Sequence, residues 1–132
     1  MKSILRGIGS YVPEKILDNK ELSLKVGTSD DWIRTRTGIR ERRIASSAQP
    51  TSELALNAAR KAIEAAQIQT DQIDLVIVAT ITPDMAFPST ACILQHKLGL
   101  GKVACFDLEA ACSGFLYSLD VADGMLASGR YK

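Results

Sequence analysis

Cys112 is the residue of this sequence whose setting is best suited to chemistry. It stands in LEAACSGFLYS (residues 108–118), between a short apolar run and a stretch whose apolar residues recur at helical spacing. We therefore expect it at or just before the first turn of a helix, where unpaired backbone N–H groups and the helix dipole favour a thiolate. Small neighbours leave room for a substrate to reach the sulfur: Ala110, Ala111, Ser113 and Gly114.

The alternative for any cysteine is a structural role, because a free thiol behaves as a small hydrophobic group. We predict that role for Cys92, inside an expected helix, and for Cys105, inside an expected strand. For Cys112 the location favours a nucleophile, since open α/β sheets place ligands at the carboxyl ends of their strands. The cysteines lack metal-type spacing, and His96 falls in mid-helix, where we expect a structural or surface role. No metal site is therefore predicted.

Trp32 and Arg36 form a second candidate site, because their spacing could create a binding surface. They are four residues apart, so a helix places the indole and the guanidinium on one face. An aromatic plane beside a cation suits a nucleotide, whose base stacks while a phosphate pairs with the cation. The alternative is that the only tryptophan packs in the core while Arg36 pairs with Asp31 or Glu41. Taken alone, these residues favour the structural role, with Trp32 in the core and Arg36 in an ion pair.

Helix and strand signals alternate along the chain, which predicts an α/β fold with a mostly parallel sheet and helices on both faces. The run 73–80 is nearly continuous in β-branched residues, as in a strand covered on both sides. The other expected strands are 3–12, 39–45 and 103–108, and the expected helices are 19–26 (capped by Asp18), 30–37 (capped by Ser29 and ended by Gly38), 52–66, 89–98 and 112–128.

The last of these helices has an apolar face that we expect to be well buried. Phe115, Leu119, Ala122 and Leu126 mark this face. A further strand should follow the helix, yet the sequence stops at Lys132. We therefore expect one domain over residues 1–132 that is incomplete at its carboxyl end.

Composition and charge exclude several classes of protein. The 132 residues are 46% hydrophobic and 23% charged, which is ordinary for a globular domain. A net charge of +1 gives no general attraction to nucleic acid or to an anionic membrane, and the apolar run 75–79 is too short to span a bilayer. An odd number of cysteines without an export signal points to reduced thiols and a cytoplasmic location.

Five segments together resemble one enzyme family. The stretch DLEAACSGF (residues 107–115) resembles the nucleophile motif of β-ketoacyl-acyl carrier protein synthase III, a thiolase-fold condensing enzyme. Four more segments resemble that family in its order: GIGSYVP (7–13), TSDDWI (28–33), TRTGIRER (35–42) and FPSTAC (87–92). The resemblance covers the whole chain. It implies the amino-terminal half of a layered αβαβα thiolase-like fold, with the carboxyl-terminal half absent from this chain.

The resemblance also implies a reaction. Cys112 would take an acyl group, usually acetyl, from acyl-coenzyme A, and the thioester would condense with malonyl-acyl carrier protein to start fatty-acid synthesis. No cofactor is implied, because acyl-coenzyme A is a substrate. The family's assisting histidine and asparagine would lie beyond Lys132, so we expect these residues alone to be inactive.

Four further residues acquire roles through the resemblance. Thr28, Trp32 and Arg36 match residues that contact coenzyme A, which reverses the preference for a buried tryptophan. Phe87 matches a residue that reaches across a homodimer to close the partner's acyl pocket, the alternative being a loop aromatic that packs on its own subunit.

Two other classes of function remain open. One is a different thiolase-fold enzyme, either a polyketide-starting synthase or one like hydroxymethylglutaryl-coenzyme A synthase. The segments TSDDW and RTGIR favour type III over both. The other is a truncated, non-catalytic chain that serves only in assembly or binding. An arginine cluster could dock an acidic carrier protein, but we expect mainly a solvated face with local ion pairs: Arg34, Arg36, Arg40, Arg42 and Arg43.

Overall fold

The computed structural model describes residues 3–131, which form two compact units. One unit contains the segment up to Tyr11 and the residues from Pro50 onward, and the other is Val12–Gln49. Each unit contains one two-stranded sheet. The sheet of the first unit is parallel, as predicted, whereas that of the second is antiparallel. The chain is therefore α/β with two small sheets of different kinds.

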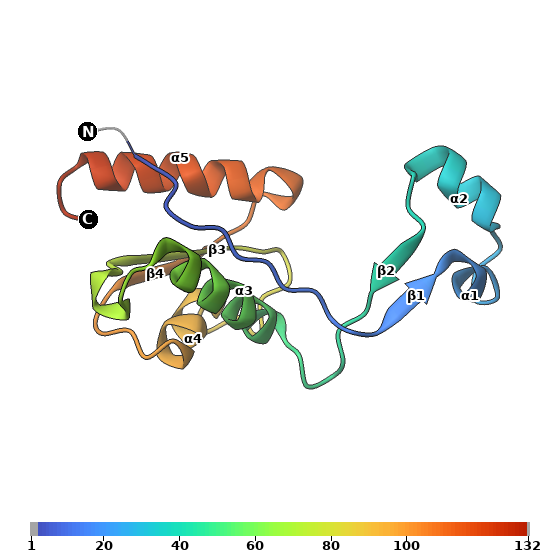
Figure 1. Cartoon of the computed structure of the whole chain (residues 1–132), viewed down its shortest axis with the longest axis horizontal. Coiled ribbons are helices and arrows are strands. Elements are labelled where there is room, and N and C mark those ends of the chain that lie inside the picture. The colour runs from blue at the N-terminus through green and yellow to red at the C-terminus, as the bar shows by residue number, and fades with distance from the viewer. Residues whose placement is uncertain (1–2, 132) are drawn as a thin grey trace. The chain divides into compact units, whose positions relative to one another are not determined.

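The first unit has three layers, with the sheet in the middle (Figure 1). Helix α5 contacts β3 on one face, and α4 contacts both strands on the other, where it also packs against α3. The elements are α3 (Thr51–Ala66), β3 (Leu75–Ala79), α4 (Thr90–Lys97), β4 (Ala104–Leu108) and α5 (Gly114–Ala127), with 3-10 turns at Thr70–Gln72 and Ala111–Ser113. No helix in the described residues is long and apolar enough to cross a membrane.

The core of this unit lies on the side of the sheet that faces α3 and α4. Val76 and Val78 point to this side, because side chains alternate along a strand. They join four further buried residues in one cluster: Leu56, Ala91, Leu94 and Leu100. The intervening residues of β3 line a hollow beneath α5. The β-branched run in the sequence thus does contact helices on both faces, as predicted.

Two predictions for this unit are wrong. The segment 3–12 forms no strand and lies instead against α3, where Gly7 and Gly9 approach so closely that a Cβ on either would overlap the helix backbone. Helix α5 is largely exposed within the described residues: Phe115 is 67% and Leu119 46% exposed, and only Gly114 is buried. Its predicted apolar face is present, but β3 covers only part of it.

The second unit is built around one buried amide. Asn19 is 1% exposed, and its Nδ2 donates to Asp30 Oδ1 at 2.8 Å and to the Ile39 carbonyl at 2.7 Å. Its Oδ1 accepts from Arg42 at 2.6 Å. The elements joined in this way are β1 (Ile16–Asp18), α1 (Asn19–Ser23), α2 (Asp30–Thr37) and β2 (Glu41–Arg43). Both predicted helix starts are confirmed, since Asp18 accepts from the Glu21 N–H and Ser29 from the Trp32 N–H.

Candidate functional site

Cys112 lies on an exposed turn between β4 and α5. It belongs to the 3-10 turn Ala111–Ser113, and α5 begins at Gly114, so the thiol precedes the helix as expected. Ala111 has a φ of +42°, which is uncommon for a residue other than glycine and is concentrated at functional turns. The turn therefore presents the sulfur outward at the carboxyl end of a parallel strand.

Contacts on both sides fix the place of this turn. Before it, the Asp107 carboxylate accepts hydrogen bonds from the backbone N–H groups of Thr90 (2.8 Å) and Ala91 (2.7 Å) at the start of α4. After it, Gly114 lies so close to β3 that a Cβ would be 3.1 Å from the Ala79 Cβ. The role of Asp107 was missed in the sequence. The only available signal was an acidic residue at the end of a strand, and it does not reveal which helix that residue caps.

The other two cysteines lie in secondary structure, as predicted. Cys92 is in α4 and Cys105 in β4, and both are partly buried. Burial raises the pKa of the Cys105 thiol, and the nearby Cys92 thiol adds to this effect. A raised pKa keeps a thiol protonated and therefore weakly nucleophilic. His96 is exposed on α4, in agreement with a surface role.

Trp32 and Arg36 lie together on α2, as their spacing predicts. The Arg36 guanidinium carbon is 5.8 Å from the centroid of the Trp32 ring, within the range of a cation–π contact. Trp32 is 57% exposed, and Ile33 is the buried residue of this helix. The alternative of a core tryptophan is therefore wrong. Glu41, one of the acids considered for Arg36, pairs with Arg43 at 3.5 Å.

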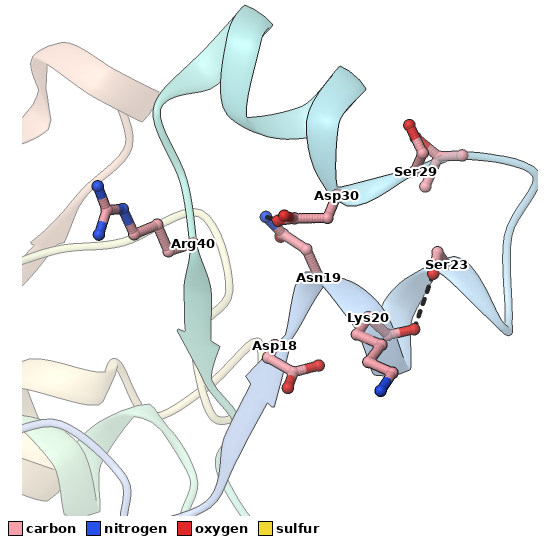
Figure 2. A pocket seen from close by; sticks show the side chains of 8 residues that line it. Asp18, Asn19, Lys20, Ser23, Ser29, Asp30 and Arg40 are labelled. Atoms are coloured by element: carbon pink, nitrogen blue, oxygen red, sulfur yellow. Dashed lines mark hydrogen bonds between the residues drawn. The ribbon is translucent and has the colours of Figure 1, made fainter.

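Thr28 lines an open hollow of about 400 Å³ beside the start of α2 (Figure 2). Its Oγ1 is buried and has no hydrogen-bond partner among the described residues. Figure 2 shows Asn19 and Asp30 pointing toward one another in this hollow. Acids and bases share the lining, which consists of Asp18, Asn19, Lys20, Ser23, Thr28, Ser29, Asp30 and Arg40. The hollow thus has polar walls without an excess of either charge.

Phe87 projects from the loop between β3 and α4. It is 87% exposed, so it does not pack on its own chain within residues 3–131. Within the described residues the ring is free, and its role across a homodimer stays a prediction. Phe87 and Cys112 belong to one unit, whereas Thr28, Trp32 and Arg36 belong to the other.

The arginine cluster forms local contacts. Arg34 pairs with Asp30 at 3.5 Å, Arg43 pairs with Glu41, and Arg42 donates to Asn19. The pairs of Arg34 and Arg43 are those of a solvated face with local partners, as expected, whereas Arg42 reaches the buried Asn19.

Comparison with known proteins shows which proteins this chain is similar to. The model of 3-oxoacyl-[acyl-carrier-protein] synthase III matches residues 106–132, which include Cys112. The β-ketoacyl-[acyl-carrier-protein] synthase III of Xanthomonas campestris is 55% identical over 130 residues, or 98% of this chain and 40% of the relative. The chain matches the amino-terminal portion of β-ketoacyl-[acyl-carrier-protein] synthase III. It spans about two fifths of the length of the curated relatives it matches.

Solved structures agree with this assignment. The 3-oxoacyl-[acyl-carrier-protein] synthase III of Aquifex aeolicus is 47% identical, with a TM-score of 0.92 over 96% of this chain and 41% of that chain. The priming β-ketosynthase of the R1128 polyketide biosynthetic pathway is 39% identical, with a TM-score of 0.87 over 90% of this chain and 36% of that chain. The fold of this chain is therefore the amino-terminal part of the thiolase-like fold.

Proposed function

We propose that this chain supplies the acyl-accepting cysteine of a condensing acyltransferase that starts fatty-acid synthesis. The observation that carries the proposal is the place of Cys112, which is exposed on a strained turn after a parallel strand, within the segment that the family model matches. Its substrates would be acyl-coenzyme A, with acetyl as the first candidate, and malonyl-acyl carrier protein.

The first half of the reaction is an acyl transfer to sulfur. The Cys112 thiolate attacks the carbonyl carbon of the acyl thioester, a new carbon–sulfur bond forms, and coenzyme A leaves as the thiolate and takes up a proton. Backbone N–H groups at the start of α5 point toward this end of the helix and favour negative charge on the oxygen of the tetrahedral intermediate. The malonyl group then loses carbon dioxide, and the resulting carbanion attacks the Cys112 thioester to release the β-ketoacyl product.

Coenzyme A is proposed to bind at the start of α2. The exposed Trp32 ring would stack on the adenine and Arg36 would pair with a phosphate, while Thr28 would line the same site. Phe87 is proposed to close the acyl pocket of the partner in a homodimer. Its exposure supports this role, because a side chain that serves another subunit must be free of its own.

Acetylation of the protein tests the proposal. The protein, expressed from its complete coding sequence and incubated with acetyl-coenzyme A, should carry one acetyl group on the peptide that contains Cys112. Cys112→Ser should abolish both the label and the condensation, because a hydroxyl lacks the acidity and nucleophilicity of a thiol. Label on Cys92 or Cys105 would refute the assignment.

A polyketide-starting synthase is the second candidate. The likeness to the R1128 priming β-ketosynthase favours it specifically. The two candidates differ in the acyl group and in the carrier protein that they accept. Condensation assays with acetyl-coenzyme A and longer acyl-coenzyme A substrates, on carrier proteins of each pathway, distinguish them.

A further inference from the structure

The loop that carries Phe87 is closed on itself by one hydrogen bond. The backbone N–H of Asp84 donates to the Oγ1 of Thr90 at 3.1 Å, across six residues. Thr90 is fully buried, so water does not compete for its hydroxyl. Residues 84–90 therefore form a closed loop, with Phe87 midway between its two ends.

Both ends of this loop are fastened to the scaffold. The Asp84 carboxylate accepts from the backbone N–H of Ser52 at 2.8 Å, at the start of α3. This helix has no side-chain cap of its own at Pro50, so Asp84 satisfies a helix N–H that would otherwise lack a partner. At the other end, the Thr90 N–H donates to Asp107 on β4. The loop is thereby anchored to a helix on one side and to the strand before Cys112 on the other.

The middle of the loop has no comparable support. Residues 85–88 are all exposed, in contrast to the buried Thr90 and Ser52. Among the described residues little packs around the ring, so the contacts that constrain the direction in which Phe87 projects are those at the ends of the loop. A substitution at Asp84 or Thr90 should therefore alter the position of Phe87.

We infer that Asp84 and Thr90 are positioning residues that hold Phe87 in place and thereby set the acyl-chain preference of the enzyme. This inference rests on the proposed role of Phe87 as a wall of the acyl pocket. A wall held in one place admits acyl chains up to a fixed length, and pockets of this kind discriminate single methylene groups by about 10–200-fold. If the loop were loosened, the Phe87 ring could move aside and the pocket would accept longer acyl chains.

Three substitutions in the protein expressed from its complete coding sequence test the inference. Thr90→Val removes the hydroxyl but keeps the shape of the side chain and the N–H that binds Asp107, whereas Thr90→Ser keeps the hydroxyl. Thr51→Val is the matched control, because it removes a hydroxyl that donates to the Thr82 carbonyl at 2.6 Å, outside the loop 84–90. Hydrogen exchange of the peptide spanning 84–90 should be about tenfold faster in Thr90→Val and unchanged in the other two variants.

The ratio of kcat/KM for butyryl-coenzyme A to that for acetyl-coenzyme A measures how well the pocket accepts a longer acyl chain. It does not depend on how much of a variant is folded. We expect roughly a tenfold rise in this ratio in Thr90→Val and in Phe87→Ala, and no change in Thr90→Ser or Thr51→Val. A purely structural role for Thr90 would lower both kcat/KM values together and leave the ratio unchanged.

The outcomes separate the inference from the proposed function. A changed ratio in Phe87→Ala with an unchanged ratio in Thr90→Val overturns the inference alone. An unchanged ratio in Phe87→Ala shows that Phe87 does not line the proposed acyl pocket, and it overturns the inference as well. The proposed acylation of Cys112 is tested separately, by the acetylation experiment.

Discussion

The three thiols of this chain differ in exposure, and their reactivity should follow. Cys112 is exposed, whereas Cys105 is partly buried and has a raised pKa. Alkylation requires an accessible thiolate. With iodoacetamide at neutral pH we expect Cys112 to be labelled first and Cys105 at least about tenfold more slowly, as followed by peptide mass mapping. In guanidinium chloride the difference should vanish. Equal rates in the folded protein would argue against the separate roles assigned to these cysteines.

Trp32 and Arg36 should contribute to ligand affinity and little to folding. Both are exposed, so Trp32→Ala or Arg36→Ala removes a stacking or charged contact without opening the core. Loss of one such contact is worth ~1–3 kcal/mol. We expect a raised KM for acyl-coenzyme A and a weaker calorimetric affinity, with an unchanged melting temperature. Arg34→Ala is the matched control, because Arg34 lies on the same helix and pairs with Asp30. Unchanged affinity in both variants would return the pair to a structural role.

At the scale of elements, the predictions that succeeded depend on local signals. Asp18 and Ser29 cap the helices that follow them, and Gly38 ends α2 with a φ of +73°. Each of these features involves residues within four positions of one another, so the sequence displays them directly. The strand covered on both faces was predicted for the same reason, because the continuous β-branched run 73–80 lies within one short segment.

The features that the sequence did not reveal depend on distant partners. Asp107 caps a helix that begins 17 residues earlier, and Asp84 binds Ser52 across 32 residues. No local sequence pattern predicts which distant backbone N–H group will donate a hydrogen bond to a given carboxylate. The segment 3–12 was predicted as a strand, but whether a segment pairs depends on an available edge, and in the described structure its glycines lie against α3 instead.

One ion pair joins two elements and should make the stability of the fold depend on pH. Lys97 Nζ on α4 is 2.8 Å from Glu53 Oε2 on α3, and this hydrogen bond is the main cause that lowers the pKa of Glu53 from its ordinary value of 4.5. A lowered pKa means that the pair stabilises the protein above pH 4.5, and that this contribution is lost as the pH falls through the lower folded-state pKa.

Lys97→Gln should therefore lower the melting temperature at pH 7 but not in strong acid. We expect a decrease of about 1–3 °C at pH 7 that disappears near pH 3, measured by circular dichroism across the pH range. Lys102→Gln, in the exposed loop before β4, is the control and should have no effect at either pH. A decrease that persists unchanged at pH 3 would assign the effect of Lys97 to packing and not to its charge.

At the scale of the whole molecule, the exposed apolar surface is the feature with the largest energetic consequence. On α5 it includes Phe115, Leu116 and Leu119, and in the amino-terminal segment Ile4 and Leu5. Monomeric proteins rarely expose apolar patches of this size without a partner surface. We propose that a further part of a longer protein supplies such a surface and packs against α5.

We predict that residues 1–132 alone self-associate and do not catalyse condensation. Several hundred Å² of uncovered apolar surface, at ~25 cal/mol per Å², correspond to about 10 kcal/mol, which is comparable to the whole stability of a domain. Sedimentation velocity should show large species, and near-ultraviolet circular dichroism should be weak. Leu116→Gln, on the exposed side of α5, should reduce association, whereas Leu24→Gln, at a still more exposed leucine of the other unit, should not. A soluble, well-packed monomer with condensing activity would contradict both the energetic argument and the proposed need for a further part.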